Sequence, residues 1–153
     1  MKTLNASMEI HAPIEVVFNA FSDFSTVGLV LRQAENITFV SQNTQGLGTE
    51  WKETKTTGVG TNQESDHKVT QFEKHWLLEV FSEDSKTSDT SIFQFSESGH
   101  WTNVTMTMHM NPKTASAKMA LLLMPRLART ILHEDLTRMK CYIENLSITE
   151  ESE

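Results

Sequence analysis

The sequence predicts an α+β fold, in which a curved antiparallel sheet of about seven strands grips one long C-terminal helix. Three observations lead to this fold class. The stretch Ala115–Leu146 has apolar residues three or four positions apart, which is the period of an amphipathic helix. About six strand-like segments follow one another between residues 36 and 111. One strand and two short helices precede them. Strands that are grouped together, rather than alternating with helices, favour α+β over α/β.

The chain begins with the predicted strand and the two short helices. Residues 6–11 alternate between polar and apolar side chains, which indicates a strand. Pro13 then suits the first position of a helix, where a backbone N–H is not needed, and apolar residues follow at helical spacing. Asp23 or Ser25 is expected to cap a second helical piece that ends near Val30.

The other strands are separated by short polar turns. They are predicted at residues 36–41, 49–57, 62–72, 75–83, 91–96 and 102–111. Glycines mark the turns at 43–48 and at 58–60, and polar residues form those at 73–74 and 98–100. Short connections of this kind predict an antiparallel meander.

The long helix is predicted to be kinked at Pro125, because proline removes a backbone donor. Before it, Met119–Met124 is apolar on all sides, so this segment either joins the core or forms a lid over a cavity. A sheet that curls round one helix leaves space between them. We interpret residues 1–148 as a single domain and the acidic residues 149–153 as a frayed tail.

The composition disfavours several classes of partner. The chain has 13 basic and 20 acidic residues among 153, a net charge of −7, which disfavours nucleic acid. Its apolar runs are shorter than the roughly 18 residues that a membrane span needs, and the start has no leader-like run, so we expect a soluble, cytoplasmic protein.

The single cysteine, Cys141, excludes an intrachain disulfide and is expected to be a small buried hydrophobe. The same apolar stretches can close a cavity or bury a dimer interface.

The motifs of metal and phosphate chemistry are missing from the sequence. The six histidines form no pair at i, i+4 and have no cysteine nearby. There is no phosphate-binding glycine loop between a strand and a helix, and no serine has a nucleophile-elbow sequence. We therefore expect neither a metal nor another cofactor.

The strand period assigns candidate ligand-binding residues. Met106, Met108 and Met110 share one face of the last strand with Val104, and flexible methionines suit either varied apolar ligands or a plain core. The same alternation places further apolar side chains inward, and the long helix adds three more. These candidates are Trp51, Val69, Trp76, Leu78, Phe93 and Phe95 from the strands, and Met119, Leu123 and Leu127 from the helix.

Two polar residues are predicted to share this inward face. If Trp51 faces inward, Glu53 does too, and Val69 brings His67 in the same way. A carboxylate and an imidazole in a partly apolar cavity have shifted pKa values and can polarise a carbonyl or move a proton, so both are candidate acid/base residues. Two alternatives stay open. A β-bulge would leave both solvated, or they only orient a ligand through hydrogen bonds.

Four motifs occur in the order and spacing of a known family. They are Met8–Phe18 (MEIHAPIEVVF) followed by Asp23-Phe24, Gly46–Trp51 (GLGTEW), Lys68–Glu73 (KVTQFE) and Glu134–Lys140 (EDLTRMK). Together they resemble the START-like superfamily, also called SRPBCC or helix-grip, in its polyketide cyclase/dehydrase branch, and they cover nearly the whole chain. Many members carry a tryptophan in the loop after Asp-Phe, where this chain has Thr26–Leu31, so a differently shaped cavity mouth is expected.

The resemblance implies an apolar ligand in a cavity between the sheet and the long helix. Members include lipid and sterol carriers, polyketide aromatases and cyclases, quinone-binding chaperones, plant hormone receptors and co-chaperones. Three hypotheses follow. The protein is a carrier or sensor of a lipid, polyketide-like or isoprenoid compound; or it is a cyclase or dehydratase that uses Glu53 and His67; or it is a co-chaperone-like interaction module, with Leu121–Met124 exposed for a partner.

Overall fold

The computed structural model describes residues 1–56, 60 and 62–151, with only the backbone of 147–151. Seven strands and four helices are present in this part of the chain. The strands are β1 (Lys2–Ile10), β2 (Asn36–Phe39), β3 (Glu50–Thr56), β4 (Asn62–Glu73), β5 (Leu77–Glu83), β6 (Thr87–Ser98) and β7 (Trp101–Pro112). The helices are α1 (Ile14–Ser22), α2 (Phe24–Val30), α3 (Ala115–Leu123) and α4 (Pro125–Glu151).

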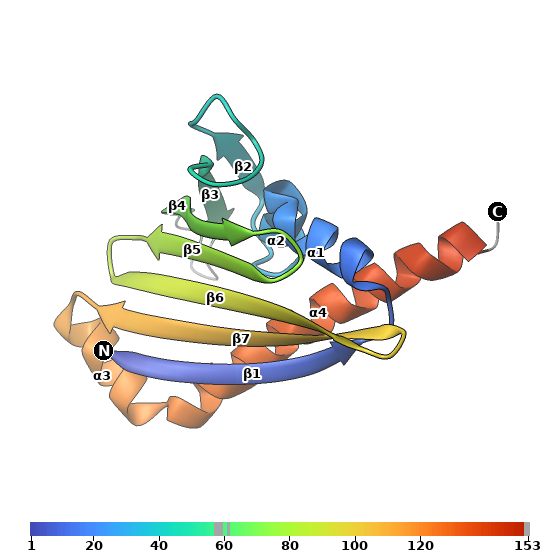
Figure 1. The fold of residues 1–153 in the computed structure, drawn as a ribbon. Helices are drawn as coiled ribbons and strands as arrows, with labels where there is room; N and C mark the ends of the chain where they lie inside the picture. The colour runs from blue at the N-terminus through green and yellow to red at the C-terminus, as the bar shows by residue number, and fades with distance from the viewer. Residues whose placement is uncertain (57–59, 61, 152–153) are drawn as a thin grey trace.

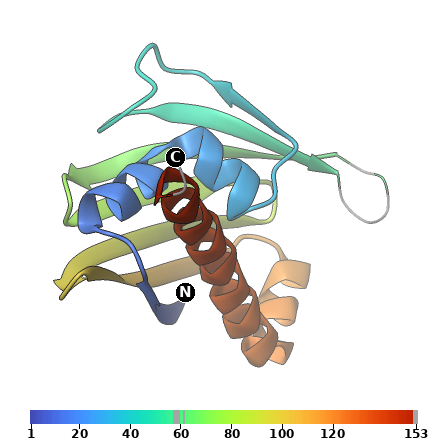
Figure 2. The same ribbon diagram turned by 90° about the vertical axis from the view of Figure 1, so that its right-hand side faces the viewer.

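The strands form one antiparallel sheet in the order β1-β7-β6-β5-β4-β3-β2. Strands β2 to β7 pair in sequence order, and β1 joins the far edge by pairing with β7. The sheet curves around the helices (Figure 1), and α4 runs diagonally across its concave side (Figure 2). The predicted α+β class and helix-grip arrangement are therefore confirmed.

The two short helices lie on the same side of the sheet as α4. Asp23 caps α2, as predicted, because its carboxylate accepts the backbone N–H of Thr26 at 3.2 Å. At the other end of α2, the guanidinium of Arg138 donates to the carbonyls of Val30 and Leu31 at 3.2 and 2.8 Å. These bonds fix α2 against the middle of α4.

The predicted long helix is two helices instead of one kinked helix. Met124 has φ −127° and ψ 51°, so α3 ends before it and α4 begins at Pro125. Proline has no N–H and disfavours a helical residue before it, which explains a complete break. Beyond the predicted end at Leu146, α4 continues to Glu151, so residues 149–151 are helical. Residues 152–153 and most of the predicted turn at 58–60 lie outside the described residues.

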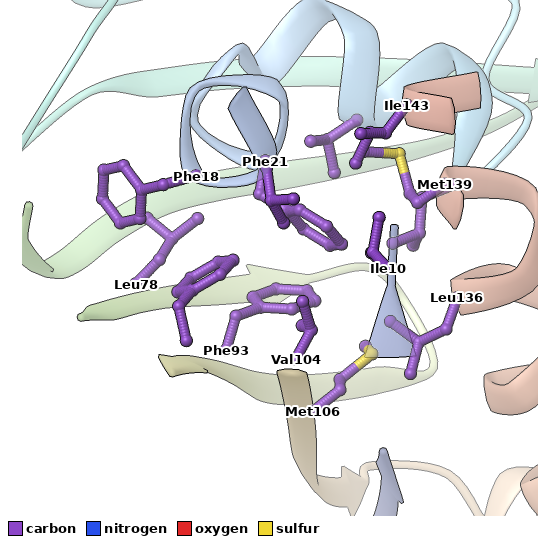
Figure 3. Close-up of a cluster of buried hydrophobic side chains, with 14 of the residues drawn as sticks. Ile10, Phe18, Phe21, Leu78, Phe93, Val104, Met106, Leu136, Met139 and Ile143 are labelled. Carbon is purple, nitrogen blue, oxygen red and sulfur yellow. The ribbon is translucent and has the colours of Figure 1, made fainter. Parts of the chain in front are cut away.

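The core occupies the half of the interface near α1 and the C-terminal part of α4 (Figure 3). Side chains from three sources meet there. They are Phe18 and Phe21 from α1, Leu78, Phe93, Val104 and Met106 from the sheet, and Leu136, Met139 and Ile143 from α4. At the opposite end, apolar residues of α3 and the first turns of α4 are exposed. The space between sheet and helix is thus filled at one end only.

Two sequence-based placements are wrong. The strand period predicts that Trp76 faces inward with Leu78, yet Trp76 is 51% exposed. It lies in the turn before β5 begins at Leu77, where strand alternation does not apply. Cys141 is exposed and not a buried hydrophobe. Two positions after the buried Met139, it points to the solvent side of α4.

Candidate ligand-binding cavity

Glu53 and His67 both face the helices, as the strand period predicts. Each residue is only 4% exposed. They come from the neighbouring strands β3 and β4, in which Trp51 lies opposite His67. The register shift between β4 and β5 falls between Val69 and Gln71, beyond His67, so it does not turn the imidazole outward. The alternative in which a bulge exposes both residues is therefore wrong.

Glu53 is held by a buried ion pair with Arg32, which follows α2. The Nε of Arg32 lies 2.9 Å from each carboxylate oxygen of Glu53, and its Nη2 lies 2.5 Å from Oε1. The indole Nε1 of Trp51 donates to the same Oε1 at 3.0 Å. Sequence reasoning missed Arg32, because only the tertiary packing of α2 brings this arginine to the sheet.

His67 is hydrogen-bonded at both ring nitrogens. Its Nε2 lies 3.4 Å from Oε2 of Glu53 and 2.8 Å from the hydroxyl of Ser65. Its Nδ1 lies 2.8 Å from the hydroxyl of Ser82. We call Arg32, Glu53, His67 and these two serines the polar cluster.

Aromatic stacking and one glycine close the polar cluster on the α2 side. The indole of Trp51 stacks between the rings of His67 and Phe24, with centroid distances of 5.2 and 4.7 Å. A Cβ at Gly28 would lie 2.8 Å from Oε1 of Glu53 and 2.1 Å from a methyl carbon of Ile37. Only glycine lets α2 pack this closely. The part of Thr26–Leu31 that belongs to α2 thus covers the carboxylate of Glu53.

The polar cluster holds one carboxylate, one guanidinium and one neutral imidazole at neutral pH. Burial raises the pKa of Glu53, but the hydrogen bond with His67 and the charge of Arg32 outweigh it and hold that pKa well below its usual range. Burial lowers the pKa of His67, and the charge of Arg32 acts in the same direction, against the hydrogen bond with Glu53. A neutral ring facing a carboxylate carries its proton on Nε2, so Nδ1 accepts from the hydroxyl of Ser82.

A cavity of about 170 Å³, which we call the inner cavity, adjoins the polar cluster. An apolar hollow of about 330 Å³, the outer groove, continues from it towards α3. Asp84 and Thr87 line both spaces. The methionines of β7 follow the same path: two line the inner cavity, and the third lines the outer groove.

The two walls of this space differ in chemistry. The wall formed by β4, β5 and β6 is polar and includes Ser65, Ser82, Asp89 and Ser91. Apart from Asp135 of α4, the wall formed by β7 and the helices is apolar. It includes Met106, Met108, Met110, Leu121, Met124, Leu127 and Ile131. This amphipathic lining suits a molecule with an apolar body and a polar edge.

The predicted ligand-binding residues divide into three groups. Four of them line the space: Met106 and Met108 the inner cavity, and Met110 and Leu127 the outer groove. Three are exposed and line neither: Met119 and Leu123 on α3, and Trp76 in the turn before β5. Outside the lining, and buried in the core, are Trp51, Val69, Leu78, Phe93 and Phe95.

Several lining residues had a usable sequence signal. Ser82 has the same strand parity as Leu78, and Asp89 has the parity of Phe93. Extending the alternation to the polar ends of β5 and β6 would have found both.

A larger crevice of about 640 Å³ lies elsewhere, between α1, the β2–β3 loop and the end of β4. It shares no lining residue with the inner cavity or the outer groove. In the described ranges, no three or more His, Cys, Asp and Glu side chains are arranged to hold a metal. Nor is any described helix long and apolar enough to cross a membrane.

A curved antiparallel sheet that grips a C-terminal helix beside a lined cavity defines the helix-grip (SRPBCC) class of proteins. The chain belongs to the family described as polyketide cyclase / dehydrase and lipid transport, which matches residues 1–144. No curated protein sequence matches this chain.

Solved structures agree on the fold. A protein from Thermus thermophilus superposes with a TM-score of 0.74 at 16% identity, covering 95% of this chain and 99% of the other. One from Rhizobium leguminosarum gives 0.75 at 16% identity, covering 94% and 95%. One from Geobacillus kaustophilus gives 0.75 at 14% identity, covering 94% and 96%. At these identities the likeness concerns the fold alone.

Proposed function

We propose that this protein binds an amphipathic small molecule, such as a lipid, polyketide-like or isoprenoid compound, and acts as a cytoplasmic carrier or sensor. The observation that carries this proposal is the amphipathic space between sheet and helices, in which the inner cavity and the outer groove share lining residues. The family description, which names lipid transport, supports the same class of ligand.

The outer groove supports an apolar body for this ligand. Met124, Leu127 and Ile131 each line it and are about half exposed. Covering apolar surface contributes roughly 25 cal/mol per Å², so a chain or ring system along these side chains gains affinity from each of them. A contiguous exposed apolar patch rimmed by polar residues is typical of a ligand groove.

Native mass spectrometry of freshly purified protein, with organic extraction of the bound material, tests this proposal. A stoichiometric adduct that extracts into organic solvent supports it and gives the chemical class. A clean apo mass, together with no equilibrium binding of a neutral apolar dye such as N-phenyl-1-naphthylamine, contradicts it.

Leu127→Glu is expected to weaken binding of this dye by about tenfold or more, because a carboxylate in the groove wall stays solvated only when the groove is empty. The measurement is a fluorescence titration. Leu122→Asp is the matched control: Leu122 is 74% exposed and does not line the groove, so affinity should be unchanged. Equal losses in both variants would mean that the dye binds the exposed surface of α3.

The exposed apolar side chains of α3 support a second candidate, the co-chaperone-like interaction module. Leu122 and Leu123 project from α3 into solvent. In that case Leu122→Asp abolishes capture of the partner while the fold and dye binding persist, and Leu127→Glu affects both.

An acid/base enzyme is the third candidate, because His67 lines the inner cavity in its neutral form. The low pKa of Glu53 and the engagement of its oxygens by Arg32 and Trp51 favour a positioning role over proton transfer. We expect His67→Gln, which retains hydrogen-bonding groups, to change dye affinity by less than about threefold. Turnover of any substrate identified by extraction is measured alongside. A loss of turnover with unchanged affinity would instead establish the enzyme.

A further inference from the structure

One carboxylate in the inner cavity differs from its neighbours. Four carboxylates line this cavity, and three of them are either paired with a lysine or an arginine or accept several N–H groups at once. Glu83 pairs with Lys113 at 2.9 Å, Asp135 pairs with Arg138, and Asp84 accepts the backbone N–H groups of Lys86 and Thr87 at 2.7 and 2.8 Å and the side-chain amide of Gln63 at 3.0 Å. Asp89 is the fourth.

Asp89 is under-satisfied. Its Oδ2 accepts the hydroxyl of Thr87 at 3.4 Å, and the backbone N–H of Asn111 acts on the carboxylate to lower its pKa. Its Oδ1 is buried and has no hydrogen-bond partner among the described residues. No described Lys, Arg or His side chain forms an ion pair with it. A buried, unpaired carboxylate oxygen costs free energy that an incoming donor can offset.

The position of Asp89 places it where the two walls meet. In the sheet register, Asp89 of β6 lies opposite Ser82 of β5 on one side and Met110 of β7 on the other. It therefore lies between the polar cluster and the methionines that lead to the outer groove. The terminal torsion of an aspartate is broad, so a small rotation turns Oδ1 towards a bound molecule.

We propose that the bound molecule presents a hydrogen-bond-donating head group, an ammonium or a hydroxyl, to Asp89, while its apolar body runs past Met110 along the outer groove. This inference rests on the proposed function and specifies the ligand class. Carboxylate and phosphate head groups are disfavoured, because they bring a second negative charge against an unpaired carboxylate.

The electrostatics of the site agree with this assignment. Burial raises the pKa of Asp89 to about 6, and the neighbouring charge of Asp84 acts in the same direction, against the hydrogen bonds from Thr87 and Asn111. At neutral pH the carboxylate is still largely ionised. Neither arginine that lines or borders the cavity pairs with Asp89, because Arg32 is bound to Glu53 and Arg138 to Asp135.

The test is displacement of N-phenyl-1-naphthylamine from the full chain by three ligands of equal chain length: dodecylamine, dodecanol and dodecanoate. We expect the amine, the alcohol or both to displace the dye at a concentration about tenfold lower than dodecanoate does, because a hydrogen bond to a charged group contributes roughly 1.5–3 kcal/mol. In Asp89→Asn this preference should fall to less than about threefold. Asp66→Asn, which removes the same charge from an exposed position on β4, should leave it unchanged.

The outcomes separate the inference from the proposed function. Loss of amine binding alone in Asp89→Asn assigns an ammonium, and loss of both amine and alcohol binding assigns a hydroxyl as well. Preference for dodecanoate, or an unchanged preference in Asp89→Asn, overturns the inference while ligand binding itself stands. Failure of the wild-type chain to bind the dye or any of the three ligands overturns both. Asp89→Ser repeats the comparison, and circular dichroism verifies that each variant is folded.

Discussion

Replacing Arg32 with methionine is expected to lower the free energy of unfolding by about 3 kcal/mol at neutral pH, with a fall in Tm of roughly 6–12 °C. The variant leaves the carboxylate of Glu53, only 5% exposed, without its guanidinium. Breaking a buried ion pair from one side costs several kcal/mol, because the remaining charge loses its partner but not its burial. Arg32 is 24% exposed, which places the expected loss at the lower end of that range. Chemical denaturation monitored by circular dichroism measures it.

Two matched variants make this prediction specific. Lys52→Met breaks exposed pairs with Glu64 and Asp66 and should change stability by less than about 0.5 kcal/mol. Arg32→Met combined with Glu53→Gln removes both charges and keeps an acceptor for the indole of Trp51, so it should recover much of the loss. A double variant as unstable as the single one would show that packing of the arginine, and not its charge, stabilises the site.

The pH dependence gives an independent check on the same pair. In the wild-type protein, folding lowers the pKa of Glu53 from its value of about 4.3 in the unfolded chain. The ionised carboxylate therefore stabilises the fold fully above that pH, and this contribution is lost only as the pH falls through the lower pKa of the folded state. Without Arg32, burial is opposed only by the hydrogen bond and charge of His67, so the pKa of Glu53 rises from its wild-type value and the carboxylate takes up a proton at a higher pH. The loss of stability in Arg32→Met should therefore shrink as the pH falls from neutral into the acidic range. If Arg32→Met loses the same free energy of unfolding at every pH, this assignment is wrong.

The strand period predicted which side chains face the helices better than which residues hold them there. Alternation alone placed Glu53 and His67 inward, because one buried neighbour on each strand fixes the parity of the whole strand. Alternation says nothing about residues outside strands. Arg32 lies after α2, where only the packing of that helix decides its partner, and Trp76 lies in a turn, where the strand period no longer holds.

The helical period likewise predicted α4, but not which part of it is buried in the core and which part is exposed. The apolar spacing in Ala115–Leu146 is continuous across Pro125, so the spacing alone does not decide whether Met119–Met124 is buried or exposed. Whether an apolar helix face is covered depends on how far the core side chains extend across the sheet. Phenylalanines of α1 and β6 fill the space under the C-terminal part of α4, and none of the described residues that line the outer groove near α3 is aromatic.

Leu136→Ala and Leu127→Ala are expected to have opposite effects on stability and on binding. Leu136 is fully buried, so its truncation should cost about 2–5 kcal/mol of unfolding free energy by creating a cavity in the core. Leu127 is 48% exposed, so its truncation should cost less than about 1 kcal/mol. Dye affinity should reverse this order: Leu127→Ala removes part of the groove wall and weakens binding several-fold, whereas Leu136 does not line the space.

Both variants remove the same atoms from the same helix, so the comparison isolates position along α4. Denaturation curves and dye titrations on the two proteins, at a temperature where both are folded, measure the two effects. If Leu127→Ala destabilises the fold as strongly as Leu136→Ala and leaves dye binding intact, the groove is part of a closed core and the binding proposal fails. If the effects separate as expected, the C-terminal part of α4 anchors the fold, and its first turns are free to contact a ligand because the core ends before it reaches them.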